Sequence, residues 1–259
     1  MKIAILYICT GKYDVFWKDF YESSEKFFLP NEEKHYFVFT DAPHIHAEDN
    51  NRVHKVFQEA MEWPYPTLLR FDIFLKVREK LQTFDYAYFF NANMLFVAPV
   101  GEEILPMKEG LMVVQHPGYY NKPRKKYPYE KDPNSGAFIP ETEGKYYAMG
   151  GLNGGRADKY LEMIETLQRN IATDLSRDVI AVWHDESHLN RYIIGRDVLV
   201  LPPSYGFVEE WELPFEPKII IRNKTKWGGH DFLRGTKTPS CLWLKLKEKL
   251  KRKIDEYVK

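Results

Sequence analysis

The sequence is poor in three features that would narrow its function at once. Its 259 residues include only two cysteines, Cys9 and Cys241, which are too far apart in the chain to indicate a disulfide framework or a zinc finger. No apolar run reaches the roughly 18 residues that a membrane-spanning helix requires. Charge of neither sign dominates, since 37 basic residues balance 37 acidic ones. These absences exclude a global attraction to nucleic acid or acidic polymers and favour a neutral or locally recognised ligand.

The beginning of the chain shows no targeting signal. The apolar run over residues 1–7 is too short for a signal peptide, and no small-residue cleavage site follows it. Because cysteine is also scarce, we expect a reducing compartment and a cytoplasmic location.

Short apolar runs alternate with helical patterns along the chain, which is typical of an α/β domain with a largely parallel sheet. Strands are predicted at 2–9, 35–40, 86–90 and 111–115, and helices at 14–29, 67–81 and 158–171. The segment 150–155 is too dense in glycine for a strand interior, so we predict a tight turn, or a close approach of the backbone to another group. The stretch 117–140 is predicted to be a long functional loop whose aromatic rings suit stacking on sugars.

An Asn-x-Asn pair, Asn91 and Asn93, follows the apolar run 86–90. Ligands of open α/β sheets collect at the carboxyl ends of strands, so the position suits a binding site. Carboxylates hold Mn²⁺ or Mg²⁺, whereas an asparagine amide offers one neutral oxygen and two N–H donors. A metal site built on this pair would be weak, and a polar turn at a strand end explains the pair when it is taken by itself.

The densest group of reactive side chains lies at 183–192, with the sequence WHDESHLNRY. A helix that starts here would place Asp185 and Glu186 in its first turn, where capping alone could account for them. His184 and His188 stand one turn apart, as do the histidines of H-E-x-x-H zinc hydrolases. Because aspartate, not glutamate, follows His184 and no third ligand follows nearby, a zinc hydrolase is the weaker alternative.

Several separated segments together resemble glycosyltransferase family 6, the group of the blood-group A and B transferases and the α-1,3-galactosyltransferase, and especially its bacterial members. The octapeptide 183–190 is similar to the family signature almost without change, as are the segments 116–120 and 145–147 with the glycines that follow. The resemblance runs from about Ile3 to Arg234. It implies a GT-A fold with a mixed, mostly parallel sheet and a catalytic domain over residues 1–237. It also implies a retaining transfer of galactose or N-acetylgalactosamine from a UDP-sugar, in α-1,3 linkage, to a galactose.

The resemblance implies a set of donor-binding positions. The segment that packs around the uracil is matched by Ile8, Cys9 and Tyr13. Arg70 matches an arginine that reaches the donor from the helix before the metal-binding motif, and Trp63 matches a tryptophan upstream of it. Asn91 and Asn93 fall on the two aspartates of the family's metal-binding motif. This departure is a trait of the bacterial branch and implies transfer without a divalent metal or other cofactor.

The diphosphate and the donor sugar are matched by further positions. Where the family's C-terminal segment folds over the diphosphate, this chain has Lys224, Lys226 and Arg234, whose charges would replace that of the metal, although a solvated basic loop is the plainer interpretation. Asp185 matches a hydrogen-bond partner of the donor sugar. The segment that selects this sugar is matched by Met149, Gly150 and Gly151. A glycine at the third position leaves room for an N-acetyl group, so UDP-N-acetylgalactosamine is expected, and Gly151→Ala is expected to shift the preference toward UDP-galactose.

Three positions match residues that contact the acceptor galactose: His116, Trp183 and Glu186. The resemblance favours a fucosylated acceptor of the blood-group H type, such as 2′-fucosyllactose. Glu186 is the predicted catalytic residue, because a carboxylate beside the anomeric carbon can stabilise an oxocarbenium-like transition state or attack it as a nucleophile. A covalent intermediate and same-face attack both stay open. A sugar-binding module without catalysis is the non-enzyme alternative.

The tail over residues 238–259 departs from the family. Leu242, Leu246, Leu250 and Ile254 recur at helical spacing among many lysines. This pattern predicts a basic amphipathic helix, which would suit a peripheral contact with an anionic membrane. It would equally suit an ordinary terminal helix docked on the domain or on another subunit.

Overall fold

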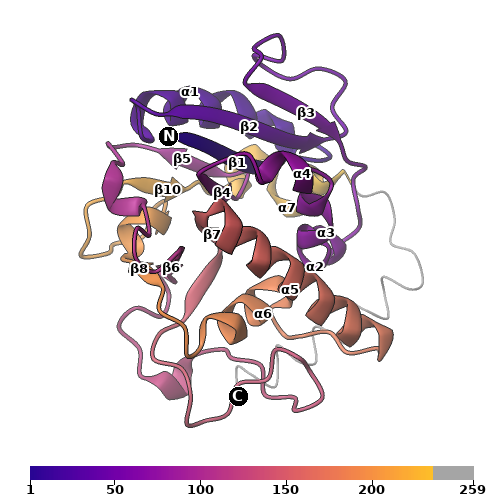
Figure 1. Ribbon diagram of the computed structural model, residues 1–259, viewed down its shortest axis with the longest axis vertical. Coiled ribbons are helices and arrows are strands. Elements are labelled where there is room, and N and C mark those ends of the chain that lie inside the picture. The colour runs from indigo at the N-terminus through magenta and orange to yellow at the C-terminus, as the bar shows by residue number, and fades with distance from the viewer. Residues whose placement is uncertain (236–259) are drawn as a thin grey trace.

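A seven-stranded mixed sheet organises the computed structural model, which describes residues 1–235 (Figure 1). The strands are β1 Lys2–Ile8, β2 Glu33–Thr40, β3 Val53–Phe57, β4 Tyr86–Phe90, β6 Leu111–Gln115, β7 Ala148–Arg156 and β8 Leu199–Leu201. Their order is β3-β2-β1-β4-β7-β6-β8. β7 runs antiparallel to β4 and β6, whereas the other neighbours pair in parallel. The predicted α/β class and the mixed, mostly parallel sheet are confirmed.

Helices cover both faces of this sheet. They are α1 Trp17–Phe27, α2 Tyr65–Leu68, α3 Arg70–Leu75, α4 Arg78–Leu81, α5 Ala157–Ser176, α6 His184–Ile193 and α7 Gly229–Arg234. Successive side chains of a strand point to opposite faces, so Ile5 and Tyr7 of β1 join the core beneath α1. Ala4 and Leu6 join the second core, beneath α3, α5 and α6. Figure 1 shows α1 and the pair α5 and α6 on opposite sides of the sheet.

A smaller three-stranded sheet brings the last part of the described chain beside β5, the strand that follows β4. It consists of β5 Met94–Phe96, β10 Ile219–Ile221 and β9 Phe207–Val208, in the order β5-β10-β9. Because β10 pairs with β5, the residue after it, Arg222, donates its backbone N–H to the Asn93 carbonyl at 2.9 Å. The chain then continues through the 3-10 helix η5, Lys224–Trp227, into α7.

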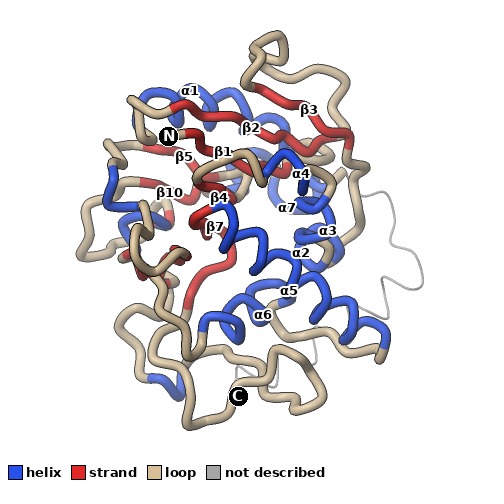
Figure 2. Tube along the Cα trace, in the orientation of Figure 1, coloured by secondary structure: helices blue, strands red, loops and turns tan. Residues whose placement is uncertain are grey.

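Two sequence predictions differ from the structure. The helix predicted over 67–81 is divided into α2, α3 and α4, because Leu69 (φ −98°, ψ 16°) and Val77 (φ −115°, ψ 20°) leave the helical conformation. The turn predicted over 150–155 is wrong, since this segment belongs to β7, a central strand (Figure 2). A Cβ atom on Gly154 would lie 2.2 Å from Cδ1 of Tyr88 on the neighbouring strand. Glycine is present there because an aromatic ring covers the backbone.

The predicted loop over 117–140 is confirmed as a mostly irregular segment, interrupted by the short 3-10 helix η3, Arg124–Lys126 (Figure 2). Two buried carboxylates fasten it to α5 and to the turn that precedes α6. Glu130 accepts a hydrogen bond from the Val182 N–H at 2.6 Å, and Asp174 of α5 accepts one from the Ser135 hydroxyl at 2.7 Å. The loop is therefore a fixed wall beside α6.

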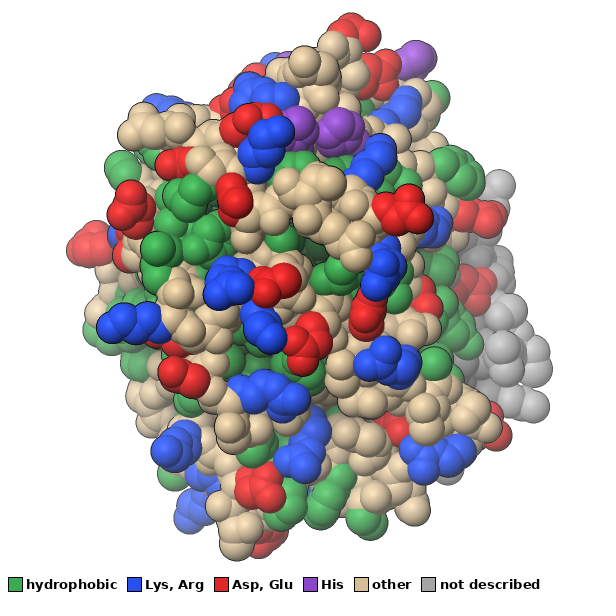
Figure 3. Space-filling view, in the orientation of Figure 1, with side chains coloured by type: hydrophobic (Ala, Val, Ile, Leu, Met, Phe, Trp, Pro, Cys, Tyr) green, Lys and Arg blue, Asp and Glu red, His purple; other side chains and the backbone are tan. Residues whose placement is uncertain are grey.

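The surface agrees with the balanced composition. The face in Figure 3 intersperses basic and acidic side chains without a large field of one sign. Within residues 1–235, no helix has the length and apolar character needed to cross a membrane. The predicted tail over 238–259 and the predicted domain limit at residue 237 lie outside the described residues.

Candidate active site

A cavity of about 220 Å³ opens at the carboxyl ends of β1 and β4. Its wall comes from four segments that are far apart in the sequence: Ile8, Thr10 and Tyr13; Met61, Trp63, Pro66, Thr67 and Arg70; Phe89, Asn91, Ala92 and Asn93; and Lys224, His230 and Arg234. This end of the sheet is where ligands of open α/β folds bind. Most of the predicted donor-binding residues are thus brought together around one space.

The fourth segment reaches the cavity because α7 docks on the loop after β1. Gly11 has φ +65°, and a Cβ atom on it would lie 2.9 Å from the carbonyl oxygens of Leu233 and Arg234. Lys12 donates its backbone N–H to the Leu233 carbonyl at 2.8 Å. Gly11 therefore allows both the left-handed backbone and the close contact that hold Arg234 over the cavity.

The cations of the cavity lie on aromatic rings. Nζ of Lys224 is 5.2 Å from the centre of the Tyr13 ring, and the Arg234 guanidinium is 4.4 Å from that of Trp63. Within residues 1–235, neither cation forms an ion pair with a carboxylate. An aromatic face positions a cation without cancelling its charge. Burial, and then the nearby charges of Arg234 and Arg70, lower the pKa of Lys224 to about 8.

His230 was missed by the sequence analysis, although it lines the same cavity. Burial and the positive charges of Lys224 and Arg234 lower its pKa. No sequence motif singles it out, because only the docking of α7 places it there. The cavity therefore concentrates positive and ionisable nitrogen groups, a composition that suits an anion.

Six predicted donor-binding residues do not line the cavity. Gly150 and Gly151 belong to β7 and Asp185 to α6. The other three are Cys9, Met149 and Lys226. Cys9 is fully buried in the core beneath α1, since it points to the opposite face from Ile8, and burial raises its thiol pKa to about 12. Met149 is buried in the same core. Lys226 is exposed, and its ammonium group pairs with Glu209 and Glu210, each at 2.9 Å.

The side-chain amides of Asn91 and Asn93 differ in whether they already form a hydrogen bond within the protein. Nδ2 of Asn93 donates to the Arg222 carbonyl at 2.8 Å, so this residue ties β5 to the end of β10. Asn91 donates its backbone N–H to the Gly151 carbonyl at 2.8 Å, whereas its side-chain amide makes no hydrogen bond to another described residue. Both line the cavity, but the Asn91 amide is the one available to a ligand.

The residues of this cavity do not fit a divalent metal. Its oxygen donors at positions 91 and 93 are neutral amides, and hard cations prefer carboxylates. Within residues 1–235, no three His, Cys, Asp or Glu side chains are grouped so that they could hold a metal ion. Of the predicted zinc pair, His184 packs its ring against Trp63 at 5.1 Å, and Nε2 of His188 lies 3.5 Å from a carboxylate oxygen of Asp174.

Glu186 lies where α6 meets β7, and both of its carboxylate oxygens are held. The Tyr147 hydroxyl donates to Oε1 at 2.6 Å, and the Gly150 backbone N–H donates to Oε2 at 2.7 Å. A Cβ atom on Gly150 would approach Cβ of Glu186 to 3.0 Å, so glycine permits this contact. Burial raises the pKa of Glu186, while the two hydrogen bonds lower it. The carboxylate is fixed in orientation.

Asn190 fixes the helix that carries this carboxylate. Its side-chain oxygen accepts from the Ala148 N–H at 2.9 Å, and its amide donates to the carbonyls of Ala148 at 2.8 Å and Glu186 at 2.9 Å. Asn190 therefore bonds to β7 as a neighbouring strand would. Its position four residues after Glu186, on the same helix face, was the available sequence signal.

Arg70 joins the cavity to this junction. Its Nη1 lies 2.5 Å from Oδ2 of Asp185 and donates to the Gly150 carbonyl at 2.9 Å. Burial raises the pKa of Asp185 to about 7, although Arg70 and the backbone N–H groups at the start of α6 lower it. Helix capping therefore accounts for only part of the role of Asp185, which also neutralises a buried arginine.

The predicted acceptor residues form an aromatic wall on the other side of Glu186. The His116 ring lies 4.9 Å from that of Tyr119 and 5.8 Å from that of Tyr147. Burial lowers the pKa of His116 to about 4, which keeps it neutral near pH 7. Nε1 of Trp183 is buried without a hydrogen-bond partner in the described part of the chain. A buried donor of this kind usually has a partner, so a bound ligand could supply one.

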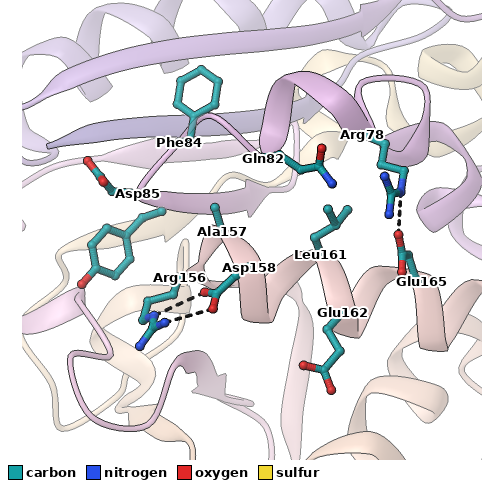
Figure 4. Close-up of a pocket in the computed structure, with 11 residues that line it drawn as sticks. Arg78, Gln82, Phe84, Asp85, Arg156, Ala157, Asp158, Leu161, Glu162 and Glu165 are labelled. Carbon is teal, nitrogen blue, oxygen red and sulfur yellow. Dashed lines mark hydrogen bonds and ion pairs between the residues drawn. The ribbon is translucent and has the colours of Figure 1, made fainter.

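A second hollow, of about 600 Å³, lies between α4, the start of β4 and the first turns of α5 (Figure 4). Asn91 lies beyond the opposite end of β4. The arginines of this hollow are already paired with carboxylates, Arg78 with Glu165 at 2.6 Å and Arg156 with Asp158 at 2.9 Å. It contains none of the predicted site residues and has no arginine left without a carboxylate partner.

The chain is similar to known glycosyltransferases along most of its length. Residues 1–233 match the profile of glycosyltransferase family 6. The chain is 38% identical to the O-antigen biosynthesis glycosyltransferase WbnI of Escherichia coli, over 89% of this chain and 99% of that protein. It is 30% identical to the globoside alpha-1,3-N-acetylgalactosaminyltransferase 1 of Mus musculus, over 88% of this chain and 68% of that protein. It is also 31% identical to the histo-blood group ABO system transferase 1 of Rattus norvegicus, over 78% of this chain and 60% of that protein.

Proposed function

Because the chain belongs to glycosyltransferase family 6, we propose that it transfers N-acetylgalactosamine from UDP-N-acetylgalactosamine to the 3-hydroxyl of a fucosylated galactose, with retention of configuration and without a divalent metal. Family membership makes it a glycosyltransferase with a nucleotide-sugar donor and a glycan acceptor. The observation that carries the finer proposal is a cavity in which Lys224 and Arg234 have no carboxylate partner in the described part of the chain, near the fixed carboxylate of Glu186.

Metal independence is supported by the charges around the cavity. When the sugar leaves, negative charge develops on the diphosphate and must be stabilised. Lys224 and Arg234 line the cavity without carboxylate partners among the described residues and can meet this charge, arginine as a fork and lysine as a point charge. Asn91 can donate its amide hydrogens to the ribose or to a diphosphate oxygen.

The choice of donor sugar is supported by Gly151 and by the N-acetylgalactosaminyltransferase activity in the name of the mouse relative. At Gly151 the backbone of β7 is in close contact with the side chains of Asn91 and Met149, which a larger residue would displace. A Cβ atom at this position would lie 2.7 Å from Nδ2 of Asn91, so Gly151→Ala would displace that amide as well as narrow the sugar site. The donor preference is therefore best measured on the unaltered protein.

Glu186 supplies the negative charge that a retaining transfer needs at the anomeric carbon. Its two hydrogen bonds leave further lone pairs on both oxygens, and burial strengthens its electrostatic effect. Attack by Glu186 to give a glycosyl ester, and same-face attack that Glu186 stabilises, are both compatible with this geometry. Asp185, paired with Arg70, is placed to orient the donor sugar.

The acceptor assignment is supported by His116 and Trp183, and by the blood-group name of the rat relative. A neutral His116 and the free Nε1 of Trp183 can hydrogen-bond sugar hydroxyls, while their rings pack on apolar sugar faces. A binding module without catalysis would not need the Glu186 carboxylate to be held at both oxygens.

The test is UDP release with UDP-N-acetylgalactosamine and 2′-fucosyllactose, in excess EDTA and with Mn²⁺, with UDP-galactose run in parallel. We expect equal rates with and without EDTA and faster transfer from the N-acetylated donor. Activity that appears only with Mn²⁺ would contradict metal independence, and faster transfer from UDP-galactose would contradict the donor choice. Donor hydrolysis without transfer would contradict the acceptor.

A further inference from the structure

Trp211 is a large aromatic residue that the proposed function does not use. Its side chain is 47% exposed, and it lies in the loop that follows β9. Its backbone N–H donates to the Val208 carbonyl at 3.1 Å, and the residue before it, Glu210, has φ +74°. Indole rings are usually buried more deeply, and an exposed one beside a site is often part of a recognition surface.

Trp211 stands next to the predicted acceptor wall. A Cβ atom on Gly118 would lie 3.9 Å from Cη2 of Trp211 and 3.3 Å from Nδ1 of His116. Gly118 also donates its backbone N–H to Nδ1 of His116 at 3.0 Å. The indole and the imidazole thus flank one glycine, whose missing side chain leaves the surface between them open.

This surface continues to the predicted catalytic residue. The His116 ring is 5.8 Å from the Tyr147 ring, and the Tyr147 hydroxyl bonds to Glu186. Successive contacts therefore link Glu186, Tyr147, His116, Gly118 and Trp211, from the buried carboxylate to the exposed indole. A sugar attached to a galactose beside Glu186 and His116 can reach the indole at the end of this series.

The loop that carries Trp211 is fixed at both ends. The Phe215 ring contacts the Tyr120 ring edge to face at 5.0 Å, which ties the loop to the segment after His116. Glu209 donates its N–H to the Ile221 carbonyl at 3.0 Å. Lys226 pairs with Glu209 and with Glu210, the residue before Trp211. Lys226, which is absent from the cavity, thus supports this loop instead.

We propose that Trp211 forms an acceptor subsite that stacks on a neutral pyranose ring attached to the acceptor galactose. The inference rests on the proposed function, since it needs the galactose to lie beside His116 and Glu186. The C–H faces of a pyranose pack on indole without desolvating charge, and a preformed aromatic platform loses little conformational entropy. Within 2′-fucosyllactose the ring is either the fucose or the glucose, and the test separates them.

The test compares Trp211→Ala with the unaltered protein on three acceptors: 2′-fucosyllactose, lactose, which lacks the fucose, and the methyl glycoside of fucosyl-α-1,2-galactose, which lacks the glucose. For 2′-fucosyllactose, kcat/KM should fall about tenfold, mainly through KM. The acceptor that lacks the stacked ring should show no loss, which identifies the ring. Trp211→Phe should restore most of the activity. Phe57→Ala is the matched control, since Phe57 is 73% exposed on β3 and has no assigned role.

Two results would overturn the subsite. One is an unchanged kcat/KM of Trp211→Ala for all three acceptors, and the other is an equal loss for all three, which would assign Trp211 to the galactose or to the fold. Failure of the proposed function would look different, because the unaltered protein would then transfer to none of them. In that case, binding of the three oligosaccharides to the UDP-loaded protein, followed by saturation-transfer NMR, still tests whether Trp211 contacts an attached ring.

Discussion

Charged side chains are arranged in opposite ways on the two sides of the candidate active site. In the cavity, Lys224 and Arg234 lie on aromatic rings and have no carboxylate partner among the described residues. At the junction of β7 and α6, Asp185 is paired with Arg70, and Glu186 accepts two hydrogen bonds. The cavity is therefore prepared for a charge that a ligand brings, whereas the junction is prepared to keep its own charge in place.

The second hollow shows why the partners of a charge matter more than the number of charges. It also contains two arginines, but each is paired with a carboxylate of the same hollow (Figure 4). Such exposed pairs contribute little and attract little. In the cavity, burial and then the charges of Arg234 and Arg70 lower the pKa of Lys224, so its cations also repel one another. An arriving diphosphate would relieve this repulsion.

The largest effect should come from removing the charge that the junction holds. Glutamine at position 186 has nearly the same shape, and its oxygen can still accept from Gly150 while its NH₂ group faces the Tyr147 hydroxyl. We expect Glu186→Gln to lower kcat by about 10³-fold or more, because the transition state loses its counter-charge. Donor affinity should change less than about threefold. Single-turnover transfer and calorimetric donor binding measure the two quantities.

Tyr147→Phe is the matched control, since it removes one hydrogen bond and leaves the charge. It should lose far less activity than Glu186→Gln. Near-normal turnover of Glu186→Gln would show that this residue has no part in the mechanism. It would also contradict the assignment of a fixed negative charge to the junction of β7 and α6.

The next effect separates two lysines of η5. Lys224 lines the cavity, whereas Lys226 is already neutralised by Glu209 and Glu210. Lys224→Gln should weaken UDP binding about 10- to 100-fold, because it removes a charge-assisted contact to the diphosphate. Lys226→Gln should change it by less than about twofold, as is usual for an exposed ion pair. Calorimetry in EDTA at low and high salt measures both variants, and equal effects would contradict the assignment of the cavity.

The sequence could predict strands that carry apolar side chains, but not a strand whose backbone is covered by the side chains of its neighbours. Apolar runs mark β1, β4 and β6, but β7 has four glycines among its nine residues, and the bulk that covers it comes from Tyr88 of the neighbouring strand. No local pattern distinguishes such a strand from a turn. The breaks in the helix predicted over 67–81 were also invisible in the local pattern, because apolar residues recur at helical spacing through α2, α3 and α4.

The sequence could predict which residues belong to the candidate site, but not which other side chains each of them contacts. The signature at 183–190 identified Glu186 and Asp185, and the position after β4 identified the asparagines. Lys224 and Lys226 are only two residues apart in the same basic run, so their different roles could not be read from it. The pairing of β9 with β10 brings Glu209 and Glu210 to Lys226, and the docking of α7 brings His230 to the cavity. Both contacts join segments that are far apart in the sequence, so no local pattern predicts them.

The smallest effect, a dependence on pH, follows from the charges of the cavity. Lys224 has a pKa lowered to about 8, so it is protonated below this pH and increasingly neutral above it. A bound diphosphate would raise the pKa again, so the complex holds more protons than the free protein and affinity must fall as the pH rises through this range. Asp185, with a pKa of about 7, is already ionised there and His230 is neutral, so neither contributes.

We expect UDP to bind about tenfold more weakly at about pH 9.5 than at about pH 8. Calorimetry in buffers of different ionisation enthalpy should detect proton uptake on binding, and Lys224→Gln should abolish both the uptake and the slope. A pH-independent affinity in the unaltered protein would mean that the cavity's cations are neutralised like those of the second hollow.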